Sequence, residues 1–161
     1  MLIVILYSDL GRPIPDSKKV EDFFDEAERN EDVESMAIVG TGLCISCDAE
    51  GKYRKVEEIA SRVIRLLEET QTLGAFFLPH CNSYVYYRSM YGHALGALGR
   101  FEEARSSCER GLFWGRKINH LFSVGVAEIH FAGVCTLKGD GEGALNHSQS
   151  CMDCRSKAAS H

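Results

Sequence analysis

The sequence predicts an all-α protein built as a row of antiparallel helical hairpins. Glycines that open similar stretches of sequence recur at Gly11, Gly51, Gly99 and Gly139. They are spaced about 40 residues apart, with a longer interval before Gly99, and a regular period of roughly 20 to 50 residues is typical of stacked repeats. Between these glycines the apolar residues follow helical spacing, which is clearest in the stripe formed by Phe101, Ala104, Cys108, Gly111 and Leu112. A lone hairpin cannot bury such stripes, so neighbouring hairpins are required.

The composition agrees with one soluble helical domain over residues 1–161. Apolar residues make up 45% and charged residues 25% of the chain, with only 3 prolines, which favours helix over loop. The net charge of −5 supplies no basic field, so we expect no nucleic-acid binding. We also expect no membrane attachment, because the apolar opening is shorter than the roughly 20 residues that span a bilayer. Seven scattered cysteines and no signal-peptide pattern favour free thiols in the cytoplasm.

The first elements lie on either side of a turn. Met1–Leu10 is either the tail of a helix that ends at Gly11 or a β-strand, since Ile and Val dominate it. No second strand candidate exists to pair with it, so helix is favoured. A chain that begins within a helix is expected to be a fragment of a longer array or to have lost its own start. Arg12–Pro15 forms a turn, and Asp16 caps the following helix.

The remaining helices are expected in pairs. Between the first pair and the second, Gln71–Ser83 carries the extra length of the interval from Gly51 to Gly99. It is either a long loop packed onto the core or a lip beside the binding groove, since insertions in repeat proteins tend to lie on one face. The predicted helices are Ser17–Arg29, Val33–Ala49, Lys52–Thr70, Tyr84–Leu98, Phe101–Lys117, Leu121–Leu137 and Glu142–Lys157.

One unit carries a specific residue pattern. A large residue, a small one, an apolar residue three positions later, a turn glycine, an aromatic and an alanine follow one another. These residues are Tyr91, Gly92, Leu95, Gly99, Phe101 and Ala104. The pattern resembles the tetratricopeptide repeat, with weaker copies from Leu43 and from Phe131. The period is longer than is usual for that family, as in the helical arms of multidomain ATPase and cyclase-type signalling regulators. The resemblance implies a right-handed superhelix.

In such a superhelix the first helix of each hairpin lines the concave groove. Residues offset by half a turn from the buried stripe are expected to face that groove, Gly133 among them. His93 and His130 either line the groove or are histidines that form hydrogen bonds within their helices. Tyr84, Tyr86, Tyr87 and Arg88 also form a cluster of residue types that are enriched at interfaces; alternatively, Tyr84 and Tyr87 belong to the core and only Tyr86 reaches the groove. The expected partner-binding residues are Ile45, Asp48, Tyr86, Arg88, Ser89, His93 and Ile129.

Two CxxC pairs are the strongest signal for chemistry, Cys44 with Cys47 and Cys151 with Cys154. The pairs lie near opposite ends of the chain, whereas a compact zinc site has only about 15–20 residues between its pairs. Cys44 and Cys47 also fall in columns of the repeat that are filled by Gly92 and Leu95, where cysteine behaves as a small apolar residue. No HExxH, GxSxG or P-loop pattern is present. We therefore expect no catalytic residue, no metal and no cofactor.

The sequence predicts a non-catalytic scaffold that binds a peptide or a partner domain in its groove. The first alternative is a ligand-sensing arm of a larger signalling protein, and a less favoured one is a cysteine-based metal or redox module. We also expect self-association, because Met1–Leu10 and the last hairpin leave apolar ends without a covering helix.

Overall fold

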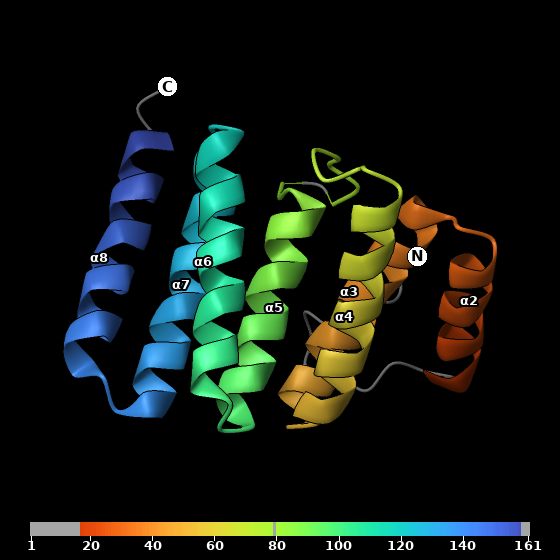
Figure 1. Cartoon of the computed structure of the whole chain (residues 1–161), viewed down its shortest axis with the longest axis horizontal. Helices are drawn as coiled ribbons and strands as arrows, with labels where there is room; N and C mark the ends of the chain where they lie inside the picture. Colours follow the sequence, from red (N-terminus) through yellow and green to blue (C-terminus); the bar gives the residue numbers. More distant parts are fainter. Residues whose placement is uncertain (1–16, 79, 159–161) are drawn as a thin grey trace.

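The computed structural model describes residues 17–78 and 80–158. Within them the chain forms seven α-helices and no strand, stacked in chain order (Figure 1). Each helix packs against the next, which confirms the predicted all-α fold. The predictions for Met1–Leu10, the Gly11 turn and Asp16 lie outside the described residues. The helices are α2 (Ser17–Arg29), α3 (Val33–Ala49), α4 (Tyr53–Glu69), α5 (Ser83–Ala97), α6 (Phe101–Lys117), α7 (Leu121–Lys138) and α8 (Gly141–Ala158).

All six turns between these helices have one left-handed residue. Glycine takes this conformation inside each hairpin, and other residues take it between hairpins. The left-handed residues are evenly spaced along the chain, except for a longer interval between Gln71 and Gly99, so the repeat unit is a single helix and its turn. The six residues are Glu31, Gly51, Gln71, Gly99, Asn119 and Gly139.

The same pair of hydrogen bonds closes every turn. At Gly99 the backbone N–H donates to the Gly96 carbonyl at 3.0 Å, and the N–H of Arg100 donates to the Leu95 carbonyl at 2.9 Å. This is the Schellman motif, which satisfies the last carbonyls of a helix. The other five turns repeat both bonds with their own residues. Identical turns explain why the helices stack in a regular row.

These turns lead to a stability prediction that depends on backbone conformation and not on side-chain contacts. Gly99 has φ +80° and a Cβ there would meet no atom within 4 Å. We expect Gly99→Ala to lower the free energy of unfolding by about 1 kcal/mol, since left-handed backbone strains a residue with a Cβ. Gln71→Gly should instead leave stability unchanged or raise it by about 0.5 kcal/mol. Urea denaturation measures both, and equal effects of the two substitutions would contradict the assignment of the turns.

The extra residues of the longer interval lie in the loop that precedes α5, and this loop is held against the helices. The side-chain amide of Asn82, which is fully buried, donates to the carbonyls of Leu73 at 2.9 Å and Ala75 at 3.0 Å. The indole N–H of Trp114 in α6 donates to the Leu73 carbonyl at 2.9 Å. The structure therefore favours the packed-loop interpretation over a free lip.

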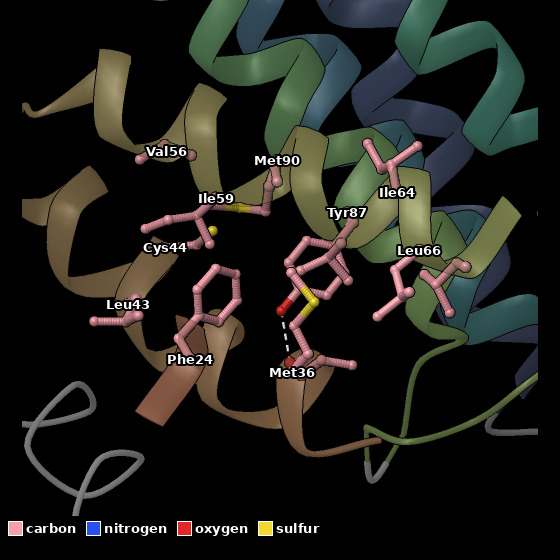
Figure 2. Close-up of a cluster of buried hydrophobic side chains, with 14 of the residues drawn as sticks. Phe24, Met36, Leu43, Cys44, Val56, Ile59, Ile64, Leu66, Tyr87 and Met90 are labelled. Atoms are coloured by element: carbon pink, nitrogen blue, oxygen red, sulfur yellow. Dashed lines mark hydrogen bonds between the residues drawn. The ribbon is translucent and has the colours of Figure 1, made fainter. Parts of the chain in front are cut away.

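The core has two parts along the row. The first lies between α2, α3, α4 and α5, where Phe24, Met36 and Tyr87 meet (Figure 2). The Tyr87 hydroxyl donates to the Ala37 carbonyl at 2.5 Å, which ties α5 to α3. The second part lies between α5 and the last helices, around Leu95 and the other apolar side chains of that cluster. The two parts meet at α5, which is the most enclosed helix.

The helices form two layers of unequal spacing. α5 packs against α7 and also touches α3, whereas no comparable contact joins α4 to α6 or α6 to α8 among the described helices. The first helices of the hairpins therefore lie closer together than the second helices. We call the exposed side of α3, α5 and α7 the inner face.

α7 is the one described helix that is long and apolar enough to cross a membrane by length and composition. In the structure it lies among α5, α6 and α8 and packs against all three. Its buried residues include Ala127, Phe131 and Val134. Burial within the row accounts for only part of its apolar composition, since 44% of the helix is buried.

Candidate functional site

A row of polar side chains crosses the inner face from α3 to α7. His93 of α5 is central: its Nε2 lies 3.5 Å from Asp48 Oδ1 of α3. On the other side the ring of His93 meets the ring of His130 of α7 edge to face, with centroids 6.1 Å apart. Tyr86 lies on α5 about two turns before His93. We call Asp48, Tyr86, His93 and His130 the polar strip.

Gly133 of α7 has no side chain, and this leaves room for the His93 ring. Gly133 follows His130 by three positions, so both lie on one face of α7. A Cβ at Gly133 would lie 3.4 Å from His93 Nδ1, so the imidazole rests against the backbone of α7. The structure therefore brings Gly133, His93 and Asp48 close together on this face.

Two polar atoms in the strip lack a hydrogen-bond partner among the described residues. They are Asp48 Oδ1 and Tyr86 Oη, and both are buried. Burial raises the pKa of Tyr86 well above its usual value, so the hydroxyl keeps its proton and remains a donor. Buried polar groups in folded proteins nearly always have a partner. These two atoms are therefore exceptions, and because both are closed to solvent, a bound group reaches them only after the side chains turn.

His130 connects the polar strip to an apolar region. Its Nδ1 lies 2.7 Å from the Val126 carbonyl; a carbonyl only accepts, so Nδ1 carries the proton. Burial lowers the pKa of His130, which keeps the ring neutral. Nε2 is then an acceptor. Val126 itself lines the neighbouring pocket.

That pocket lies between α7 and α8 and has a volume of about 280 Å³. Its lining is apolar apart from Arg155. Phe122 and Ile129 at its edge are 54% and 51% exposed, which is high for large apolar side chains. We call it the α7–α8 pocket, and its lining residues are Leu121, Phe122, Gly125, Val126, Ile129, Cys151, Cys154 and Arg155.

The structure assigns two of the expected groove residues to helix contacts instead. Ser89 is 0% exposed and its hydroxyl donates to the Val85 carbonyl, beside α6. Arg88 is 8% exposed and pairs with Glu68 of α4 and with the Tyr84 hydroxyl. Because α5 is flanked by four helices, its free stripe is too narrow to include them.

The other expected residues lie on or beside the inner face. Asp48, Tyr86 and His93 belong to the polar strip, and Ile129 lines the α7–α8 pocket. Ile45 is half-buried on α3, one turn before Asp48. Their role in partner binding stays a prediction.

Sequence reasoning did not find the α7–α8 pocket, although a signal was present. Phe122, Val126 and Ile129 recur at intervals of four and three, which is a second apolar stripe on α7. The core stripe of α7 contains Val124, Ala127 and other buried residues instead. The second apolar stripe of α7 lies outside the core, and it is the sequence signal for the pocket.

All seven cysteines are free. Cys44 and Cys108 are fully buried, and burial raises the pKa of the Cys108 thiol to about 12. Burial raises the pKa of Cys44 as well. In the described part of the chain, no group of three or more His, Cys, Asp or Glu side chains is arranged to hold a metal ion. The buried thiols of Cys44 and Cys108 thus pack as apolar groups between helices.

This burial predicts slow alkylation. Iodoacetamide reacts with thiolates, so at pH 8 we expect Cys44 and Cys108 to be labelled only after unfolding in urea. Mass spectrometry of peptides measures the sites. Raised pKa values in the folded state also mean that stability is full below about pH 8.5, the usual thiol pKa, and falls as the pH rises toward the folded value. Rapid native labelling of Cys108 would contradict the packing.

Comparisons with protein-family models, with curated proteins and with solved structures found no match. The class of protein therefore rests on the geometry alone. Seven packed helices joined by identical turns are consistent with a helical repeat.

Proposed function

We propose that this protein is a non-catalytic scaffold of the tetratricopeptide type that binds a peptide segment across its inner face. The observation that carries the proposal is the polar strip, whose Asp48 Oδ1 and Tyr86 Oη are buried without partners among the described residues. An extended peptide offers hydrogen-bond donors and acceptors at each residue. The α7–α8 pocket beside the strip offers an apolar site for one side chain.

The α7–α8 pocket does not by itself support a ligand-sensing arm. Small-molecule sites usually have volumes of about 300–1,000 Å³ and several converging polar groups. The α7–α8 pocket, at about 280 Å³, has a single charged residue in its lining, Arg155. Such a pocket suits one side chain of a larger partner better than a whole metabolite.

Display of random peptides on phage tests the proposal. Clones selected on the wild-type protein are measured again on Tyr86→Phe with Ile129→Ser, a pair of changes that removes one hydroxyl and one exposed apolar side chain from the inner face. We expect most selected peptides to lose affinity. Arg105→Gln on the outer surface of α6, where Arg105 pairs with Glu109, is the control. Peptides that bind all three proteins equally would exclude the inner face.

We further propose that copies associate through α8. Leu145 is 69% and Met152 is 63% exposed on this last helix, which has no fully buried residue among those described. Apolar ends of helical arrays need a cover. Light scattering of wild-type protein and of Leu145→Lys with Met152→Lys at high concentration tests this, and a wild-type monomer would refute it.

A further inference from the structure

The carboxylate of Asp48 is an exception among the acidic groups at helix contacts. Glu28 pairs with Arg62 and Arg65, and Glu57 pairs with Arg100. Asp48 has a single ion-pair contact among the described residues, with His93 Nε2 at 3.5 Å. That distance is longer than a normal N–H···O hydrogen bond. The side chain is 34% exposed, so solvent reaches it although Oδ1 is turned inward.

The local backbone does not compensate this charge. Asp48 lies in the last turn of α3, where the partial charge of the helix is negative, and that turn has no basic residue. An acidic side chain there is unfavourable for the helix. His130 is kept neutral by burial and adds no positive charge. The polar strip is therefore complementary to a cation.

The α7–α8 pocket lies farther along the row from this acidic position, beyond His93 and His130. His93 contacts both Asp48 and His130, and the hydrogen bond of His130 to Val126 leads into the pocket lining. A ligand on the inner face therefore meets a carboxylate over α3 and an apolar hollow over α7. This order is fixed by the stacking of the helices.

We infer that the inner face takes a peptide in which a basic side chain, Arg or Lys, pairs with Asp48 and a bulky aliphatic side chain fills the α7–α8 pocket. This inference rests on the proposed function and narrows its partner class. Charge complementarity selects a basic segment, since the protein itself has a net charge of −5. The apolar lining selects Leu, Ile or Met for the second side chain.

The test uses short labelled peptides with one Arg and one Leu at varied spacing on a Gly/Ala/Ser background. Matched peptides carry citrulline for Arg, which keeps the shape and removes the charge, or Ala for Leu. Fluorescence anisotropy measures their affinity for wild-type protein, Asp48→Asn, Ile129→Ser and Glu109→Gln. Glu109→Gln is the control for Asp48→Asn, because it also removes one negative charge but lies on α6. Circular dichroism verifies that each variant folds.

For wild-type protein we expect citrulline to weaken binding about tenfold. Asp48→Asn should abolish the preference for Arg over citrulline and keep the preference for Leu over Ala. Ile129→Ser should abolish the preference for Leu and keep the preference for Arg. Glu109→Gln should change neither preference. Equal discrimination in Asp48→Asn and wild-type protein would overturn the inference, as would equal loss in Glu109→Gln. Acidic or wholly apolar peptides that need Tyr86 and Ile129 but not Asp48 would overturn the inference and leave the scaffold function standing. Absence of any binding that depends on the inner face would overturn both.

Discussion

Gly40→Ala is expected to lower the free energy of unfolding by about 2–3 kcal/mol, although alanine is the better helix former. A Cβ at Gly40 of α3 would lie 2.8 Å from a ring carbon of Phe24 and 2.8 Å from the hydroxyl oxygen of Tyr87. Both side chains are fully buried (Figure 2). The clash therefore falls where α2, α3 and α5 meet, and neither ring can move without opening the core. Urea denaturation measures the change.

Two comparisons make the Gly40 prediction specific. Gly141→Ala is the control, since a Cβ at Gly141 would meet no atom within 4 Å; we expect no loss of stability there. Tyr87→Phe removes one of the two clashing atoms but also a buried hydrogen bond, which by itself costs about 1 kcal/mol. In the Gly40→Ala background the cost of Tyr87→Phe should be smaller, because the change also relieves the clash. If the effects of the two substitutions simply add, the Tyr87 hydroxyl is not what clashes with the new Cβ.

His147→Ala is expected to cost about 3 kcal/mol and to loosen α8. Glu128 of α7 is 2% exposed, and its carboxylate is held by His147 Nδ1 at 2.6 Å and by Arg116 at 3.0 Å. The His147 ring also stacks on Phe131, with centroids 4.0 Å apart. Arg116 is mostly exposed and cannot shield the charge from the apolar surroundings. Without His147, the buried Glu128 carboxylate keeps one partner, Arg116, and that partner is exposed to water.

Thermal denaturation and hydrogen exchange of α8 amides measure this effect. The matched variant is Glu128→Leu, which replaces the buried charge with an apolar side chain of similar size. With Leu at this position the cost of His147→Ala should fall to about that of the lost stacking, about 1 kcal/mol. If His147→Ala costs the same in both backgrounds, the histidine stabilises α8 through packing alone.

The sequence was sufficient to predict the helices and the turns inside the hairpins. Gly51, Gly99 and Gly139 identify their own turns because glycine adopts left-handed backbone most easily. The turns at Glu31, Gln71 and Asn119 use the same conformation with residues that give no such signal. For this reason the period visible in the sequence is a pair of helices, whereas the structure repeats with every helix.

The candidate site was predicted in part. Asp48, His93 and Gly133 come from helices far apart in the chain, and their shared helical phase placed them on one face. Ser89 was placed there by the same reasoning and Arg88 because its residue type is enriched at interfaces, but α6 covers Ser89 and Arg88 pairs with α4. Helical phase gives the direction of a side chain relative to its own helix. The width of the stripe that stays exposed depends on how many other helices pack around that helix.

The sequence by itself determined the seven helices and their order, because helical periodicity and glycine turns are local properties. Only the tertiary structure decided which polar atoms lost their partners. Among the described residues, Asp48 Oδ1 and Tyr86 Oη have no hydrogen-bond partner, and Asp48 Oδ1 keeps only the longer contact with His93 at 3.5 Å. The α7–α8 pocket likewise exists only through the contact of two helices. Both features depend on the distances between helices, and no local sequence pattern encodes those distances.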